Sequence, residues 1–197
     1  MLFRSARTSL PPETVAAMEL AAANVARFHG ASLPADTRVE TMPGLVVEKV
    51  WRPLDRVGLY VPGGATPLFS TLLMLALPAR AAGVEEIVVV TPPSPGGLAP
   101  ALALAAELCG ITHVWTVGGA QAIAALAFGA GEIPACPKIC GPGNAWVAEA
   151  KSLVSALPGG PAIDMPAGPS ELMVIADATA DPATVAADLL SQAEHDA

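Results

Sequence analysis

Short apolar runs alternate with helix-forming stretches through the middle of the chain, and this alternation constrains the fold more than any other feature. The apolar runs are Val57–Val61, Glu86–Thr91, His113–Val117 and Lys138–Cys140. The stretches with helical periodicity that come after them cover about residues 70–82, 98–108, 119–128 and 144–156. Strands this short and this apolar are buried on both faces, so the pattern predicts an α/β fold with a doubly wound, mostly parallel sheet.

The two ends of the chain differ from this central part. Helical periodicity covers Glu13–Phe28, and the polar stretch from Pro34 to Pro53 predicts a strand or a short hairpin. Near the other end, Leu172–Ala176 predicts a further strand, and Asp181–His195 predicts a closing helix with proline at its first position. We therefore expect three parts: a helix and extended segment over residues 1–55, the central domain over 56–171, and the start of a second α/β unit over 172–197.

Composition excludes two classes of partner. Hydrophobic residues make up 53% of the chain, but Pro62, Pro67 and Pro78 interrupt the uncharged run from Val57 to Ala79, which leaves segments too short for a bilayer core. The net charge of -8 argues against nucleic acid, because phosphate binding needs clustered Lys and Arg. We expect a soluble protein with no membrane and no nucleic-acid partner.

The cysteines indicate a reducing compartment. Cys109, Cys136 and Cys140 form no CxxC pair, and their number is odd. The first residues, Met1 to Arg7, carry two arginines with no apolar run behind them, unlike a signal peptide. We expect reduced thiols that pack in the core of a cytoplasmic protein.

Glycine-bearing turns come after three of the expected strands. They are Tyr60 with Pro62-Gly63-Gly64, Gly118-Gly119 with Gln121, and Gly141-Pro142-Gly143-Asn144. Ligands of doubly wound sheets bind at the carboxyl ends of the strands, where glycine lets backbone N–H groups approach a phosphate or a ribose. The GxGxxG fingerprint is absent, because Trp146 stands where its third glycine would be. The residues alone leave tight strand-to-helix turns open as the alternative.

The closing helix brings three polar side chains to one face. At about 100° per residue, Asp188, Gln192 and His195 fall beside one another. An imidazole and an amide oxygen could supply part of a metal's coordination shell, although Gln is an unusual ligand and tetrahedral zinc needs more partners. A solvated polar face near a helix end is the more common reason for such spacing.

Five segments, taken in order, resemble histidinol dehydrogenases. They are Gly58–Gly64, Val117–Ala127, Gly141–Asn144, Asp164–Glu171 and Asp188–His195. The resemblance runs from about residue 28 to the last residue. The chain looks like the middle portion of that family's proteins, without an N-terminal stretch and without the part beyond the closing helix.

The resemblance implies an activity and a set of site residues. Histidinol dehydrogenases oxidise L-histidinol to L-histidine in two NAD-dependent steps through a bound aldehyde, with zinc holding the substrate, and act as homodimers in histidine biosynthesis. Residues 56–171 would then form a Rossmann-like domain without GxGxxG. Carried over by motif, the expected NAD contacts are Tyr60, Gln121 and Asn144. The expected zinc ligands are Gln192 and His195, which would also contact the substrate together with Ser170.

The family's catalytic Glu-His pair has no counterpart here. The one adjacent Glu-His pair in the sequence, Glu194-His195, belongs to the ligand motif. We therefore assign no catalytic residue and expect no dehydrogenase turnover by this polypeptide alone. The alternatives are a nucleotide-binding or interaction module without catalysis, and a dehydrogenase of the same scaffold that acts on another alcohol.

Overall fold

The computed structural model describes residues 2–63, 68–165 and 172–193 of the 197-residue chain. Backbone contacts divide the chain into two compact units, residues 1–166 and 167–197. The domain boundaries expected after residues 55 and 171 stay predictions.

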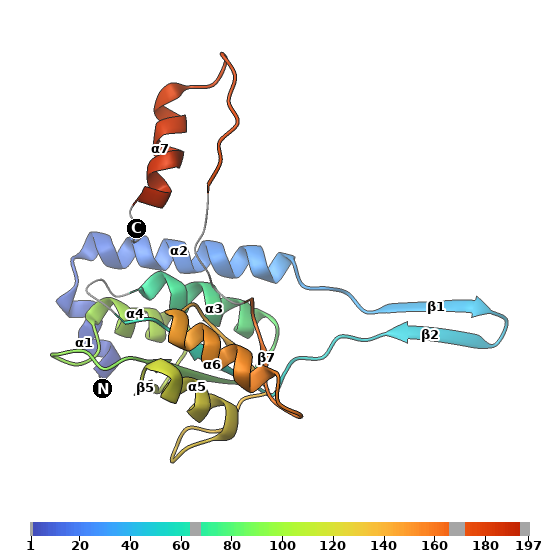
Figure 1. Cartoon of the computed structure of the whole chain (residues 1–197). Helices are drawn as coiled ribbons and strands as arrows, with labels where there is room; N and C mark the ends of the chain where they lie inside the picture. Colours follow the sequence, from blue (N-terminus) through green and yellow to red (C-terminus); the bar gives the residue numbers. More distant parts are fainter. Residues whose placement is uncertain (1, 64–67, 166–171, 194–197) are drawn as a thin grey trace. The chain divides into compact units, whose positions relative to one another are not determined.

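The first unit is built on a five-stranded sheet (Figure 1). Its strands are β3 (Arg56–Tyr60), β4 (Glu86–Thr91), β5 (Val114–Thr116), β6 (Lys138–Cys140) and β7 (Ala162–Ile163). Their order is β5-β4-β3-β6-β7, and every neighbouring pair is parallel. In chain order, β4 and β5 are added on one side of β3, and β6 and β7 are then added on its other side. The point where the strand order reverses therefore lies between β3 and β6, as in doubly wound folds.

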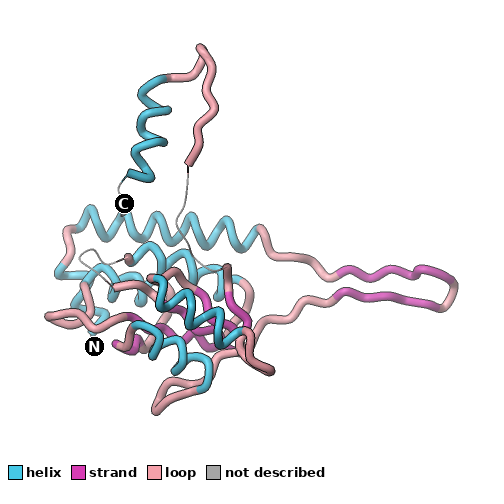
Figure 2. The backbone as a smooth tube through the Cα atoms, viewed as in Figure 1, coloured by secondary structure: helices cyan, strands magenta, loops and turns pink. Residues whose placement is uncertain are grey.

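Helices cover both faces of this sheet (Figure 2). The buried side chains form two clusters because successive residues of a strand point to opposite faces. Leu59 belongs to the cluster that contains α2 (Pro12–Ala31), α3 (Phe69–Ala81) and α4 (Pro100–Leu108). Its neighbour Tyr60 belongs to the other cluster, with α5 (Gly119–Phe128) and α6 (Ala145–Ser155). The expected α/β architecture, with a helix before the sheet, is confirmed.

The N-terminal part contains one element that periodicity did not predict, the helix α1 (Leu2–Ser9). The predicted hairpin is present as β1 (Thr37–Met42) paired antiparallel with β2 (Leu45–Lys49). Every residue of both strands is exposed, and the hairpin forms a sheet separate from the main one (Figure 1). Gly44 has a φ of 82° at its turn, a conformation that favours glycine.

The second unit contains α7 (Pro182–Ala193). The carboxylate of Asp181 accepts hydrogen bonds from the Ala183 N–H at 3.0 Å and from the Thr184 hydroxyl at 3.1 Å. These bonds lower the pKa of Asp181 and fix the start of the helix. None of the helices in residues 2–63, 68–165 and 172–193 is long and apolar enough to cross a bilayer.

The strand expected over Leu172–Ala176 is wrong. The backbone forms no ladder there, and the side chains of Met173 and Ile175 are 83% and 93% exposed. A strand needs a neighbour to pair its N–H and C=O groups, and the described residues of this unit offer none. An apolar alternation alone was therefore not sufficient to make a strand.

Candidate functional site

The carboxyl ends of β3 and β5 are joined by the side chain of Tyr60, one of the expected cofactor contacts. Tyr60, at the end of β3, is 4% exposed, and its hydroxyl accepts a hydrogen bond from the backbone N–H of Gly119 at 3.2 Å. Gly119 begins α5, directly after the turn at the end of β5. The turns after β3 and β5 both pack against Pro92. A Cβ on Gly63 would lie 3.1 Å from the Pro92 side chain, and a Cβ on Gly118 would lie 2.6 Å from it. Two of the three glycine-bearing turns are thus brought together.

The third turn lies against the end of β3. Gly141 comes directly after β6 with a φ of 128°, and a Cβ there would lie 2.0 Å from the carbonyl oxygen of Tyr60. A Cβ on Gly143 would lie 2.4 Å from a methyl carbon of Val147 in α6. Glycine is required at both positions because of this close approach. We call the three turns together with Tyr60 and Gln121 the strand-end cradle.

Asn144 ends the third turn and caps α6. Its side-chain Oδ1 accepts a hydrogen bond from the Val147 N–H at 3.1 Å, which satisfies one free N–H of the first turn of the helix. Its amide nitrogen has no hydrogen-bond partner among the described residues, so two donors are available to a ligand. The side chain of Asn144 is exposed, whereas that of Tyr60 is buried.

Gln121 lies on the first turn of α5 and is also exposed. Its Oε1 lies 2.7 Å from the place that a Cβ on Gly119 would take. The side chain therefore lies over the backbone of Gly119, the same residue that donates to Tyr60. The structure brings Gln121 and Tyr60 to one turn, whereas Asn144 begins the helix after β6.

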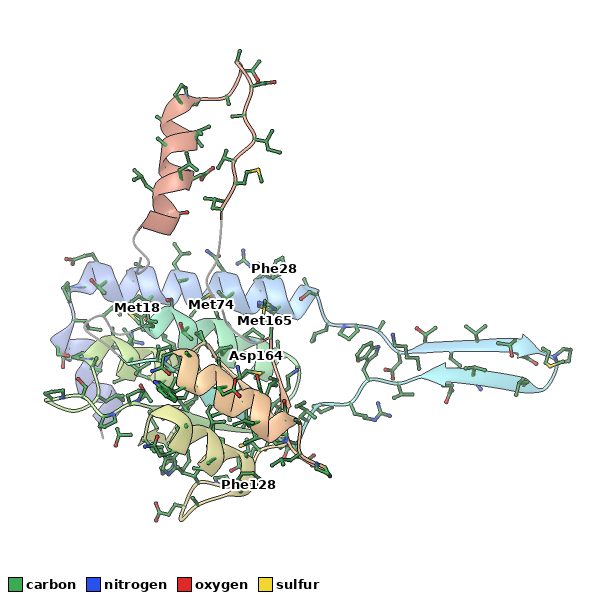
Figure 3. The ribbon with its side chains drawn as sticks, viewed as in Figure 1. Met18, Phe28, Met74, Phe128, Asp164 and Met165 are labelled. Atoms are coloured by element: carbon green, nitrogen blue, oxygen red, sulfur yellow. The ribbon has the colours of Figure 1, made fainter. Side chains whose placement is uncertain are left out.

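An ion pair between a buried lysine and a partly exposed aspartate adjoins Gly141 in the third turn, and none of the sequence motifs predicted it. Lys151 of α6 is 2% exposed, its Nζ donates to the carbonyl oxygen of Gly141 at 2.9 Å, and it forms an ion pair with Asp164 Oδ1. The other carboxylate oxygen of Asp164 accepts from the N–H of Gly141 at 2.6 Å. Figure 3 labels Asp164, which comes directly after β7. The signal for Lys151 was its spacing, because it lies between Val147 and Val154 on the buried face of α6.

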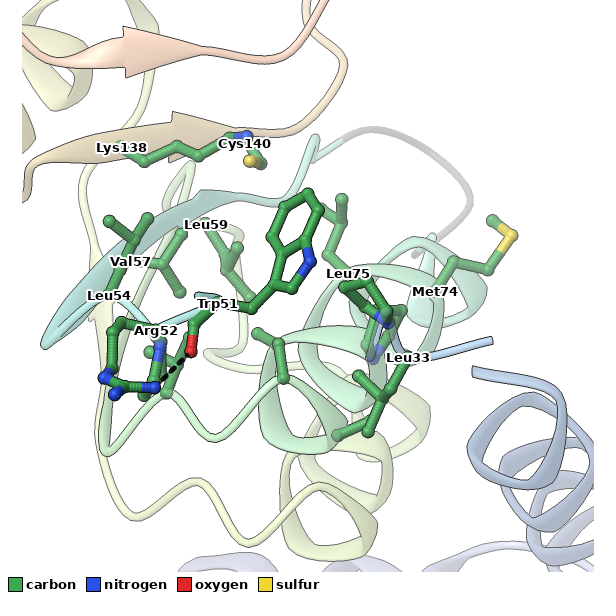
Figure 4. A pocket seen from close by; sticks show the side chains of 17 residues that line it. Leu33, Trp51, Arg52, Leu54, Val57, Leu59, Met74, Leu75, Lys138 and Cys140 are labelled. Atoms are coloured by element: carbon green, nitrogen blue, oxygen red, sulfur yellow. Dashed lines mark hydrogen bonds between the residues drawn. The ribbon is translucent and has the colours of Figure 1, made fainter. Parts of the chain in front are cut away.

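Two cavities differ in their relation to this cradle. A small one of about 180 Å³ opens at the carboxyl ends of β3, β4 and β5, and Pro62, Gly63, Thr91 and Thr116 are among the residues that line it. A larger groove of about 640 Å³ lies on the sheet face with Leu59, between β6 and α3 (Figure 4). Trp51, Met74 and Cys140 contribute to its lining, and none of the predicted site residues does. The small cavity, and not the large groove, adjoins the cradle.

The predicted zinc ligands are only partly described. Gln192 is helical within α7, whereas His195 and the expected substrate contact Ser170 lie outside the described residues. In the described parts of the chain, no group of three or more His, Cys, Asp or Glu side chains could hold a metal ion. The zinc site therefore stays a prediction that rests on residues 192 and 195.

Comparison with known proteins adds a family to this geometry. The sequence profile of histidinol dehydrogenases matches residues 2–197. A histidinol dehydrogenase of Xylella fastidiosa is 59% identical over 192 residues, which cover 97% of this chain and 44% of that protein. One from Xanthomonas axonopodis pv. citri is 56% identical over 194 residues, 98% of this chain and 45% of its own length. The chain thus spans less than half the length of these curated relatives.

The fold agrees with a crystal structure of the same kind of protein. The histidinol dehydrogenase of Elizabethkingia anophelis superposes with a TM-score of 0.93 at 45% sequence identity. The match covers 98% of this chain and 44% of that one. Because the family profile spans nearly all of the sequence and the backbone agrees with that of a solved member, the chain belongs to the histidinol dehydrogenase family.

Proposed function

We propose that this chain supplies the NAD-binding domain and two zinc ligands of a histidinol dehydrogenase. The reaction is the oxidation of L-histidinol to L-histidine in two NAD-dependent steps through histidinaldehyde. The observation that carries the proposal is the strand-end cradle, in which Tyr60 ends β3, Gln121 lies in the first turn of α5 and Asn144 caps α6. The two bacterial relatives are named histidinol dehydrogenases, which supports L-histidinol as the substrate.

The cradle fits an anionic dinucleotide without a cluster of basic side chains. The N-terminus of α6 carries a partial positive charge from its aligned peptide dipoles, and Asn144 adds two N–H donors beside it. Gly141 lets the turn after β6 pack directly against the backbone of Tyr60, which holds Asn144 at the start of α6 beside the end of β3. When bound, NAD would accept the hydride removed from the alcohol carbon.

The proposed zinc and substrate contacts lie at the other end of the sequence. Gln192 and His195 would hold zinc and meet the substrate, with Ser170 as a further substrate contact. Their spacing of three residues suits one helical face, and Gln192 belongs to α7. Zinc would act as a Lewis acid that orients the substrate. His195 must be neutral to offer a ring nitrogen, so metal binding would weaken as pH falls below the imidazole pKa.

The remaining properties derive from the same proposal. Residues 56–171 would form the NAD-binding domain, and residues 172–197 would begin a second domain that carries the zinc ligands. The complete enzyme would be a cytoplasmic homodimer that works in histidine biosynthesis. Its catalytic Glu-His pair would come from sequence that this chain does not contain.

A chimaera tests this function. This chain would replace the matching 192-residue region of the Xylella fastidiosa relative, and NADH formation would be measured with L-histidinol and zinc. We expect turnover by the chimaera and none by the 197-residue chain alone. Steady turnover by the isolated chain would contradict the part of the proposal that places catalysis elsewhere.

Two variants of the chimaera separate the cofactor half from the metal half. Tyr60→Phe should weaken NAD binding and leave zinc content unchanged, whereas His195→Ala should lower zinc content and leave NAD binding unchanged. A chimaera that binds NAD but never oxidises L-histidinol would instead favour a nucleotide-binding module, or a dehydrogenase of another alcohol.

A further inference from the structure

Lys151 is the one charged side chain among the buried polar residues of the described chain, which are Thr71, Thr91 and Lys151. Removing an ammonium group from water is unfavourable unless it gains close partners. An apolar residue would satisfy the packing at this position, because Val147 and Val154 flank it on the same face of α6. Packing alone therefore does not explain why a charged residue stands at position 151.

The charge of Lys151 interacts with Gly141, whose backbone lies just beyond the last paired residues of β6 with β3 and with β7. The last pairs are Leu59 with Cys140 and Ile139 with Ile163, so neither β3 nor β7 pairs with Gly141. Gly141 is nevertheless buried, where an unpaired N–H or C=O would be costly. Asp164 accepts from its N–H at 2.6 Å, and Lys151 donates to its carbonyl at 2.9 Å.

We propose that Lys151 and Asp164 are positioning residues for the cofactor, acting as a clamp on both polar groups of Gly141. The ion pair between the two side chains joins the two hydrogen bonds into one closed set. The clamp fixes the turn that ends at Asn144, and so sets where the free amide of Asn144 and the first turn of α6 meet NAD. The inference rests on the proposed function for the identity of the ligand, and on the clamp's geometry for the rest.

The clamp also links two segments with different proposed partners. Asp164 begins the segment that contains Ser170, the expected substrate contact, whereas Lys151 and Gly141 belong to the turn and helix of the cofactor side. Because both clamp residues form hydrogen bonds with the backbone of Gly141, a change at either residue should act on the Gly141 turn first.

The test uses the complete 197-residue chain and the substitution Lys151→Met, which keeps the length of the side chain and removes its charge. Lys138→Met is the matched control, because Lys138 lies in β6 and lines the large groove. Two quantities are measured: hydrogen exchange of the Gly141 amide by NMR, and NAD affinity by calorimetry. For Lys151→Met we expect at least about tenfold faster exchange at Gly141 and about tenfold weaker NAD binding, with less than about twofold change for the control.

The outcomes are distinguishable. Unchanged exchange at Gly141 and unchanged NAD affinity in folded Lys151→Met would overturn the clamp, as would an equal rise in exchange at every amide. If the unsubstituted chain fails to bind NAD, the proposed function fails, and Gly141 exchange alone still decides whether the clamp exists. Should Lys151→Met not fold, Asp164→Ala serves instead, since it removes both the charge of the ion pair and the acceptor of the Gly141 N–H. Exchange at Gly141 equal to that of the unsubstituted chain would then overturn the proposal.

Discussion

The carbonyl oxygen of Tyr60 fills the space that a side chain at Gly141 would need. A Cβ on Gly141 would lie 2.0 Å from this oxygen and 2.9 Å from the carbonyl carbon. The contact involves backbone atoms of β3, which cannot move aside as a flexible side chain would. The point where the strand order reverses, between β3 and β6, is therefore closed by a glycine.

Gly141→Ala should be strongly destabilising for this reason. We expect a loss of more than about 3 kcal/mol in the free energy of unfolding, measured by urea denaturation. Gly110→Ala is the control, because Gly110 also has a positive φ, 65°, but has open space around it. The control should lose only the cost of the left-handed backbone, about 1–2 kcal/mol. Equal losses for the two variants would contradict the role of the Tyr60 contact.

The elements with a strong period of their own were predictable. The strands over residues 57–61 and 86–91 and the helix over 119–128 are indicated by local apolar patterns, and the structure places them within a residue or two. The strand β7 could not be predicted in this way, because its two residues are defined by the neighbouring β6 and not by a pattern. The converse holds for Leu172–Ala176: its apolar alternation predicts a strand, but no neighbouring strand pairs with it among the described residues, and no strand forms.

The sequence predicted the residues of the candidate site that follow the strand ends, but it did not predict the ion pair of Lys151 with Asp164. Tyr60, Gln121 and Asn144 lie at or just after strand ends, so chain order alone placed them at the carboxyl edge of the sheet. The partnership of Lys151 with Asp164 depends on β7 lying beside β6, which no local pattern indicates. A lysine in an apolar helical stripe was the available signal.

Asn144 has two roles that two substitutions can separate. Asn144→Ala removes the cap of α6 and should cost about 1 kcal/mol of stability, measured by thermal or urea unfolding. Asn144→Asp keeps an oxygen that can accept from Val147 and should leave stability close to that of the unsubstituted chain. It removes the two N–H donors and adds a negative charge, so NAD binding should weaken in both variants. Undiminished NAD affinity in Asn144→Asp would show that Asn144 acts only as a cap.

The three thiols should differ in reactivity. Burial raises the pKa of Cys109 and of Cys136 to about 12 from an ordinary value of 9.0. Burial also raises the pKa of Cys140, but this side chain is only half-buried. With iodoacetamide at neutral pH, mass spectrometry should show modification of Cys140 first and of the other two only after unfolding. Cys140→Ser should then remove the early modification; rapid labelling of Cys109 in the folded chain would contradict the burial argument.

The same shifts give a dependence of stability on pH. A buried thiol holds its proton more tightly in the folded chain than in the unfolded one, so its contribution to stability is complete below pH 9. As pH rises from 9 toward 12, the unfolded chain loses protons that the folded chain retains, and stability falls. Urea midpoints measured across this range should decrease, and Cys109→Ala with Cys136→Ala should flatten the decrease. A midpoint that rises with pH would contradict the sign of both shifts.

The exposed hairpin predicts self-association. Val39 and Val47 face each other across β1 and β2 and are 49% and 54% exposed, and a two-stranded hairpin alone is only marginally stable in water. We expect sedimentation velocity to show association that increases with protein concentration. Val39→Thr with Val47→Thr should weaken it, because threonine keeps the β-branched shape that suits a strand and replaces a methyl group with a hydroxyl. Leu20→Gln is the control, since Leu20 is 63% exposed but lies on α2. A monomer at all concentrations, or equal weakening by the control, would show that the hairpin is not the contact surface.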